Sequence, residues 1–335
     1  MTALASLALT ETEFLDVVSE ASRAPSVHNI QPSRFRHSRP GAIELCRDGM
    51  RSLPVCDPEG RDVRMSLGAS CEGLAIALSR RGFGLVDVIL CDTTAAEAVA
   101  ELRFERRASH DVLAPHVFRR STWRRSFRPA SADALAALDS RVRAHHAVWA
   151  ADRESVTLAS RLIDPATRAR ALEPAAWGET WRWLRLTRGH EGWSRDGLNA
   201  EALGLSSLEA AVAKRLLNPE TLRWLRWSGV DAVASSEAAQ VRSASGLIGI
   251  LSDPSEDPFV VGRRLYRIWL DVTAIGLSLC PMSALAEWDV SRSALDRHWS
   301  VPAGQRLVNV LRVGDSGTPK IRLTPRLPPE ELILQ

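Results

Sequence analysis

Small hydrogen-bonding side chains stand between prolines in the segment A-P-S-V-H-N-I-Q-P, residues 24–32. The prolines restrict the backbone, so the polar side chains are held near fixed positions. These side chains are Ser26, His28, Asn29 and Gln31. Donors and acceptors on a constrained loop suit the edge of a planar heteroaromatic ring and its polyol tail. On composition alone, an ordinary turn rich in Pro, Ser and Asn explains the segment equally well.

A second group of candidate residues is the run of arginines between positions 119 and 128. A guanidinium is always charged and binds two oxygens of a phosphate dianion at once. The run therefore favours a phosphorylated ligand, although a solvated basic turn is an open alternative. A nucleic-acid surface is disfavoured, because nothing in the run resembles a recognition helix.

Regular elements must position these residues. A capping box at Thr10–Glu13 predicts a helix that ends before Pro25, so the polar loop follows directly from a helix end. The periodicity of the apolar residues and the positions of turn-forming residues predict a helix at 63–80 and strands at 42–46, 85–91 and 101–106.

Two segments share a pattern at a constant offset of 194 positions. Gly68 and Gly82 bracket one predicted helix, and Gly262 and Gly276 bracket another with the same spacing. Each helix also follows an apolar run and an Asp-Pro turn. Glycine capping of two unrelated helices explains part of this pattern, whereas an internal duplication explains all of it.

Six tryptophans lie within residues 177–227: Trp177, Trp181, Trp183, Trp193, Trp224 and Trp227. The spacing of Trp177 and Trp181, and of Trp224 and Trp227, is typical of core-facing helix stripes. A lid or an aromatic wall beside a substrate is the alternative.

The polar loop resembles the A-P-S-x-x-N-x-Q-P-W signature of nitroreductase-family flavoproteins, with Ser33 in place of the usual Trp. Residues 120–127 resemble the R-R-T-N-R-R-P-F element of the long, fused subgroup of that family, from which Trp123 departs. Shorter similarities continue in order at 57–69, 195–198, 262–283 and 311–326.

This resemblance implies an α+β fold, with a sheet flanked by helices in each of two halves, 1–115 and 116–335. The halves would dock as an internal pseudo-dimer with a lid at about 175–230. One FMN site would take its polar loop from the first half and its phosphate-binding arginines from the second. Pro281 and Met282 would lie against the flavin ring, although such residues also commonly pack in cores. The implied cofactor-binding residues are Ser26, His28, Asn29, Gln31, Arg120, Ser121, Arg124, Pro281, Met282 and Arg326.

The resemblance also implies electron transfer from NAD(P)H through FMN to a nitro, quinone or metabolite acceptor. No side chain stands out as a general acid or base, and no histidine or cysteine spacing indicates a metal. Two alternatives stay open: a flavin-storage protein without turnover, and a tailoring oxidase or dehydrogenase that acts on one dedicated metabolite. The chain would be a monomer or a homodimer.

The composition restricts the partners and the cellular compartment that we expect for the protein. The balance of 43 basic and 40 acidic residues gives a net charge of +3, too small to indicate a nucleic-acid partner. Five scattered cysteines indicate a reducing compartment, and the sequence shows neither a signal peptide nor a membrane span. We therefore expect a cytoplasmic enzyme that acts on a small molecule, away from membranes.

Overall fold

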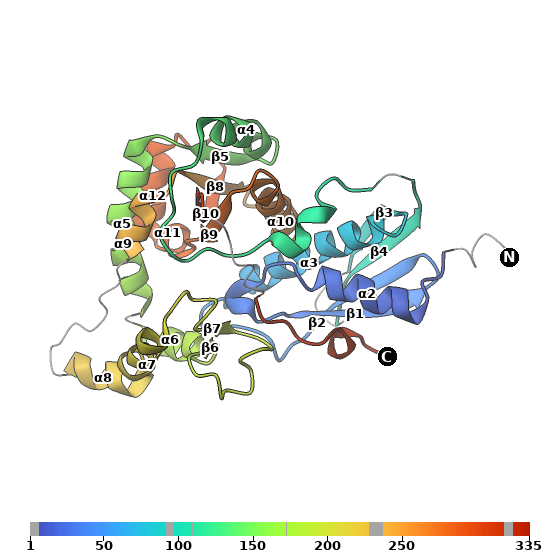
Figure 1. The fold of residues 1–335 in the computed structure, drawn as a ribbon, viewed down its shortest axis with the longest axis horizontal. Helices are drawn as coiled ribbons and strands as arrows, with labels where there is room; N and C mark the ends of the chain where they lie inside the picture. The colour runs from blue at the N-terminus through green and yellow to red at the C-terminus, as the bar shows by residue number, and fades with distance from the viewer. Residues whose placement is uncertain (1–6, 92–96, 109, 172, 228–236, 318–323) are drawn as a thin grey trace.

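The computed structural model describes residues 7–91, 97–108, 110–171, 173–227, 237–317 and 324–335. Its described part holds two antiparallel four-stranded sheets, each flanked by helices (Figure 1). The predicted α+β fold class is confirmed. No described helix is both long enough and apolar enough to cross a bilayer.

The first sheet has the strand order β1-β2-β4-β3. Its elements are α2 (Glu11–Ala21), β1 (Ser33–Arg39), β2 (Ala42–Arg47), α3 (Arg61–Ser79), β3 (Phe83–Leu90) and β4 (Ala98–Arg106). The capping box of Thr10 and Glu13 begins α2 as predicted, and α2 ends at Ala21. Strand β1 was not predicted, because Phe35 is its one large apolar residue and its far end is exposed. Strand β1 forms because it pairs with β2 in the folded chain, and the local sequence pattern does not encode this pairing.

The second sheet has the order β5-β8-β10-β9. Its elements are α4 (Ala132–Arg143), β5 (Ala147–Ala150), β8 (Gly246–Ser252), α10 (Pro258–Ala274), β9 (Ser278–Pro281) and β10 (Arg306–Gly314). Strand β8 is buried along its whole length, and α10 packs its apolar face against the sheet. The element sequence and strand order thus match those of the first half, element by element.

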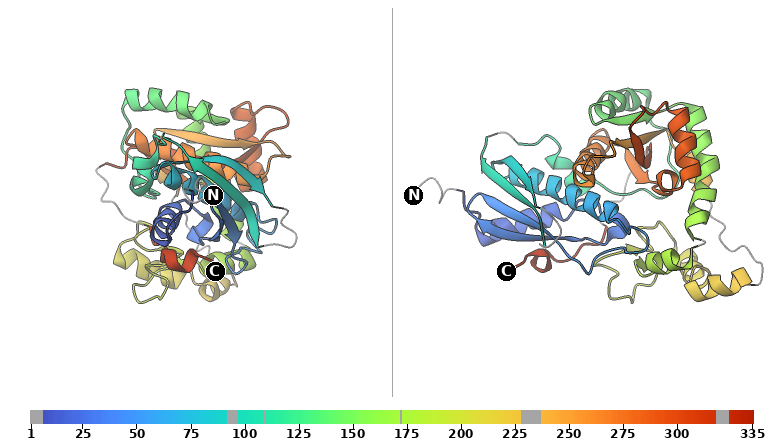
Figure 2. Two further views of the ribbon diagram at one scale, coloured as in Figure 1. Left: turned by 90° about the vertical axis from the view of Figure 1, so that its right-hand side faces the viewer. Right: turned by 180° about the vertical axis from the view of Figure 1, so that it is seen from behind.

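Additional segments distinguish the second half. Between β5 and β8 lie α5 (Arg153–Ala171), α6 (Pro174–Trp181), β6 (Leu184–Arg185), β7 (Leu198–Asn199), α7 (Ser207–Leu216), α8 (Pro219–Trp227) and α9 (Glu237–Arg242). Between β9 and β10 lie α11 (Ala284–Glu287) and α12 (Asp289–His298). Residues 174–227, here called the insertion, lie below both sheets in Figure 1 and in the rear view of Figure 2.

Helices α3 and α10 pack against each other and join the two halves. Short 3₁₀ helices complete the chain at η1 (Val27–Asn29), η2 (Ala114–Arg119) and η3 (Pro329–Leu332). The C-terminal residues return to the first half, where Ile333 forms a bridge with Phe35 of β1. The chain end is therefore tied to the element that follows the polar loop.

Candidate flavin site

A cavity of about 250 Å³ lies where the polar loop, α3, α10 and the arginine run meet. Seven predicted site residues line it: Ser26, His28, Asn29, Arg120, Arg124, Pro281 and Arg326. The fold thus brings the polar loop and the arginines, which are far apart in sequence, to one place. No group of three or more His, Cys, Asp or Glu residues in the described ranges is arranged to hold a metal.

The backbone of the polar loop is unusual. His28, Asn29 and Gln31 adopt positive φ angles of 45°, 56° and 53°. Residues other than glycine rarely occupy this left-handed region, and they remain there only when surrounding contacts hold them. Ser26 Oγ accepts the Gln31 N–H at 3.0 Å, and Ser66 Oγ of α3 accepts the Val27 N–H at 3.0 Å.

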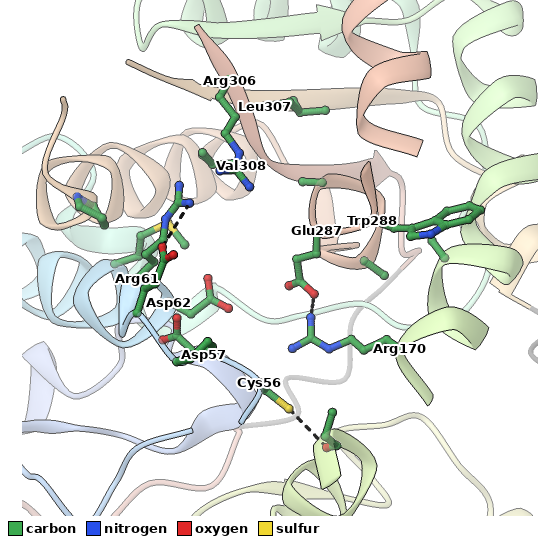
Figure 3. Close-up of a pocket in the computed structure, with 18 of the residues that line it drawn as sticks. Cys56, Asp57, Arg61, Asp62, Arg170, Glu287, Trp288, Arg306, Leu307 and Val308 are labelled. Carbon is green, nitrogen blue, oxygen red and sulfur yellow. Dashed lines mark hydrogen bonds and ion pairs between the residues drawn. The ribbon is translucent and has the colours of Figure 1, made fainter. Parts of the chain in front are cut away.

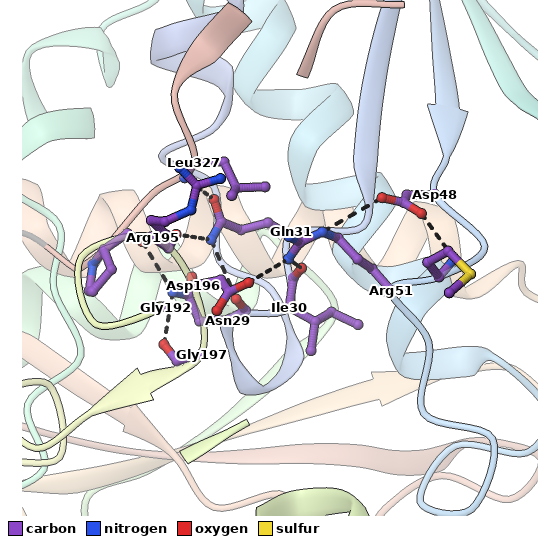
Figure 4. A network of polar contacts seen from close by, with 12 residues as sticks. Asn29, Ile30, Gln31, Asp48, Arg51, Gly192, Arg195, Asp196, Gly197 and Leu327 are labelled. Carbon is purple, nitrogen blue, oxygen red and sulfur yellow. Dashed lines mark hydrogen bonds and ion pairs between the residues drawn. The ribbon is translucent and has the colours of Figure 1, made fainter. Parts of the chain in front are cut away.

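The insertion and the C-terminal segment supply further contacts to this loop (Figure 4). Asn29 Nδ2 donates to the carbonyl oxygens of Gly197 at 3.0 Å and Pro325 at 3.1 Å. Gln31 Nε2 donates to Arg195 O at 2.8 Å, and Gln31 Oε1 accepts the Leu327 N–H at 2.9 Å. The amides of Asn29 and Gln31 are therefore engaged with protein, so both residues shape the loop.

Three predicted residues lie outside the cavity lining. Gln31 is occupied as described above. Ser121 uses its carbonyl oxygen to accept from Trp269 Nε1 at 3.4 Å, and the neighbouring Thr122 lines the cavity instead. Met282 is 7% exposed and packs in the core of the second half. Their assignment as cofactor contacts stays a prediction, and this geometry favours a supporting role for each.

Arg120 and Arg326 line the cavity, and the charge of Arg23, which was not predicted and does not line it, acts on both of them. Arg120 Nη2 donates to Arg23 O at 3.0 Å, and its guanidinium lies 4.6 Å from the ring centre of Trp269. Arg326 donates to the carbonyl oxygens of Ser22, Arg23 and Ala24. Within the described residues, none of these three guanidinium groups pairs with a carboxylate.

Unpaired buried cations are costly, and the electrostatics of this cluster show the cost. Burial lowers the pKa of Arg120 to about 10, with contributions from Arg23 and Arg124. Burial also lowers the pKa of Arg326 well below its ordinary value, and Arg120 and Arg23 add to the effect. The Nε atoms of Arg23 and Arg120 are buried without an acceptor among the described residues. No described carboxylate therefore balances the charge of this cluster.

Two other polar atoms near the cavity are also buried without a described partner. Tyr266 Oη lies on α10 near the arginine cluster, and burial raises the pKa of Tyr266 to about 12. Asn309 Oδ1 lies on β10, and Asn309 lines the cavity. Neither residue belongs to a recognisable motif, so neither could be predicted from a local pattern.

His28 faces the same cavity, and its imidazole is uncharged at neutral pH. Burial lowers the pKa of His28 from 6.5 to about 4, and the positive charges of Arg170 and Arg124 lower it further. A neutral ring can donate through one nitrogen and accept through the other. His28 therefore offers a polar but uncharged contact to a ligand.

A second cavity, of about 540 Å³, adjoins the first (Figure 3). Both cavities are lined by Asp62, Met65, Arg170 and Glu287. Arg170 of α5 and Glu287 of α11 form an ion pair at this junction. Asp62 lies in the first turn of α3, and burial and the negative charge of Asp57 raise its pKa to about 6. Sequence analysis singled out neither the second cavity nor Asp62.

The tryptophans of the insertion have different environments. Trp177 donates from Nε1 to Leu217 O at 2.8 Å, and Trp183 packs against the core of the first half. Trp224 is 61% exposed, so the prediction of a core-facing stripe is wrong for this residue. The side chain of Trp227 lies outside the described residues. The insertion contributes Leu198 to the lining of the first cavity.

No family model matches the sequence. Among curated proteins, "Putative NAD(P)H nitroreductase Rv3131" of Mycobacterium tuberculosis H37Rv is 26% identical over 307 residues, or 89% of this chain and 83% of that protein. The protein "Putative NAD(P)H nitroreductase MT3217" of strain CDC 1551 matches to the same extent. This similarity supports the assignment of the chain to the nitroreductase-like superfamily, which its motifs indicate.

Solved structures with similarity to this chain carry related names. A crystal structure titled as a putative nitroreductase from Anabaena variabilis gives a TM-score of 0.47 at 10% identity and covers 93% of this chain and 91% of its own. A nitroreductase with bound FMN from Bacteroides fragilis gives 0.36 at 12% identity and covers 62% and 89%.

Proposed function

We propose that the protein is an FMN-dependent oxidoreductase that takes electrons from NAD(P)H and passes them to a small nitro, quinone or metabolite acceptor. The observation that carries this proposal is that Arg120 and Arg326 line the cavity with the charge of Arg23 close behind them. These guanidinium groups have no carboxylate partner among the described residues, so their positive charge suits a phosphate dianion, and the Arg120 Nε–H, which has no described acceptor, could donate to it. The curated relatives are named for the same chemistry.

The donors and acceptors along the cavity fit the remainder of FMN. Arg120, Arg326 and Arg23 would hold the phosphate, with the Tyr266 hydroxyl as an additional donor. His28, Asn309 and Ser26 would offer polar contacts to the ring and its tail, and Pro281 would lie beside the ring. Bound FMN supplies the two-electron chemistry, and the protein supplies binding, orientation and exclusion of water.

We further propose that residues 1–115 and 116–335 are two related halves docked as an internal pseudo-dimer. The contact between α3 and α10 supports this proposal. A Cβ atom at Gly68 would meet the carbonyl oxygen of Phe259, and one at Gly262 would meet that of Met65. Gly68 and Gly262 are 194 positions apart, and Met65 and Phe259 are separated by the same offset. The two contacts are therefore equivalent under the proposed duplication.

The same offset predicts one flavin for each chain. Ala69 lines the cavity, and its counterpart is Arg263, which donates to Glu72 at 2.8 Å. Glu72 also accepts from Arg267, which pairs in addition with Asp111. This ion network would occupy the position that the offset relates to the candidate flavin site, so one chain would hold one site as a monomer or within a homodimer. All five cysteines are free, which favours the cytoplasm as the place of action.

The test is visible absorption of the protein after loading with FMN and desalting, followed by anaerobic titration with NADPH and with NADH. Retained yellow colour that bleaches with either nucleotide supports the reductase. Retained colour that stays oxidised would favour flavin storage or an oxidase reduced by its own substrate. Absence of retained flavin would contradict the proposal.

A further inference from the structure

The two cavities meet at a junction that holds three charged groups. Arg170 and Glu287 neutralise each other across the junction. Asp62 extends from α3 into the same space, as Figure 3 shows. These groups line both the larger cavity and the candidate flavin cavity, so they would contact a small reactant that lies between the two.

Unlike the carboxylates of Asp57 and Glu287 near the junction, the Asp62 carboxylate has no hydrogen-bond or ion-pair partner among the described residues. The Asp57 carboxylate accepts the Val63 N–H at 2.9 Å, and that of Glu287 pairs with Arg170. In the ranges that the structure describes, no side chain or N–H donates to the Asp62 carboxylate. Ser66 Oγ reaches only its backbone oxygen, at 2.7 Å. The Asp62 carboxyl is therefore available to a ligand.

We propose that Asp62 is the proton donor that completes reduction of the electron acceptor, an inference that rests on the proposed function. A quinone acceptor gains a hydride from reduced FMN, which carries two electrons and one proton. Its second oxygen then takes a proton from the Asp62 carboxyl, which leaves a hydroquinone and an Asp62 carboxylate. Water in the larger cavity returns a proton to the carboxylate.

The electrostatics around Asp62 support this role. Burial and Asp57 raise its pKa to about 6, although Arg170 and Arg61 oppose the rise. The other charged groups that line the larger cavity are Glu59, Glu173, Glu287 and Arg306. A carboxyl with this pKa is substantially protonated near pH 6 and remains acidic enough to release its proton, as general acid catalysis requires.

The experiment compares the FMN-loaded protein with Asp62→Asn, Asp62→Glu and the control Asp133→Asn. Asp133 occupies the corresponding second position of α4 and is exposed. Each protein is reduced anaerobically and mixed with tetramethyl-1,4-benzoquinone, whose blocked ring resists attack by thiols. Flavin reoxidation is followed in a stopped-flow spectrometer between pH 5 and 8.

For the unaltered protein we expect a reoxidation rate that falls as pH rises above about 6. Asp62→Asn should retain FMN and be reduced normally, but should reoxidise at least about tenfold more slowly at pH 6, without that pH dependence. Asp62→Glu should recover part of the rate, and Asp133→Asn should match the unaltered protein. Equal rates and pH profiles for Asp62→Asn and the unaltered protein would overturn the proposal while leaving the reductase intact.

A second readout needs no flavin. Because the folded pKa of Asp62 is raised from 3.8 to about 6, the folded state binds more protons than the unfolded state between these values. Its contribution to stability therefore falls as pH rises through this window. Asp62→Asn should raise the melting temperature of the flavin-free protein above pH 6 but not below pH 4. A pH-independent difference would show that folding does not raise the pKa of Asp62, as the proposal requires. If the unaltered protein retains no FMN, the proposed function fails first, and this inference fails with it.

Discussion

Arg326 Nη1 donates to Asn29 Oδ1 over 2.8 Å, which joins the C-terminal segment directly to the polar loop. The two residues are 297 positions apart in the chain. Asn29 holds its left-handed backbone partly through this contact, and Arg326 is aimed at the cavity by the same contact. One hydrogen bond therefore couples the loop geometry to Arg326, the proposed phosphate-binding residue.

Removal of either arginine should weaken FMN binding. A charge-assisted hydrogen bond contributes about 1.5 to 3 kcal/mol, so Arg120→Ala and Arg326→Ala should each raise the FMN dissociation constant roughly ten- to hundredfold. Quenching of FMN fluorescence on titration with protein measures this constant. Arg188→Ala is the control, since the Arg188 side chain is 81% exposed and pairs with Glu201 at the surface. Unchanged affinity in both cavity variants would refute the phosphate assignment.

The close approach of α3 and α10 predicts a strict requirement for glycine. A Cβ atom at Gly68 would lie 1.9 Å from the carbonyl oxygen of Phe259, so the helices must separate to accept alanine. We expect Gly68→Ala to lower the free energy of unfolding by about 1 to 3 kcal/mol, the range for overpacked cores. Urea denaturation measures the change. Gly178→Ala, in a helix with no atom within 4 Å of the added methyl group, should be neutral or stabilising.

His28 should make the protein sensitive to acid. Its folded pKa of about 4 lies below the ordinary 6.5, so the folded state binds fewer protons than the unfolded state between these values. Stability should decline as pH falls through this window. Asparagine tolerates the left-handed backbone, so His28→Asn should fold in the same way. This variant should lack the part of the stability loss that protonation of His28 causes. Melting temperatures of both proteins at pH 7 and pH 4.5 measure the difference, and parallel losses would argue against a buried neutral imidazole.

Glu179 anchors the insertion to the first half. Its carboxylate is 1% exposed and accepts the backbone N–H groups of Val55 and Cys56, the latter at 2.7 Å. Glu179→Gln places an amide NH₂ group where an acceptor is needed, and a buried unsatisfied donor costs about 1 to 3 kcal/mol. We expect faster limited proteolysis within residues 174–227. The exposed Glu220→Gln should be cleaved at the rate of the unaltered protein.

Contiguous motifs made the candidate site partly predictable. The polar loop and the arginine run each place several distinctive side chains within ten residues, so their types and order are visible in the sequence. Their meeting in one cavity depends on the resemblance to a known family, because no local pattern relates residue 29 to residue 326.

The remaining site residues escaped prediction for physical reasons. Asp62 looks like an ordinary first-turn carboxylate, which helix ends favour in any protein. Its raised pKa arises from burial and from Asp57, and both depend on the folded arrangement. Arg23 and Asn309 are similar cases, since a single Arg or Asn carries no pattern. Helices α2, α3 and α10 and strands β2, β3 and β4 were predictable because their apolar periodicity is local, whereas β1 depends on its neighbour.

The cavity takes its loop and its arginines from one continuous chain, and this connection has a consequence for assembly. If the two parts belonged to separate subunits, dilution would pull the site apart. Here the encounter of the halves is intramolecular, so its equilibrium does not depend on protein concentration. The site should therefore remain assembled in a cell that makes only a few copies of the protein.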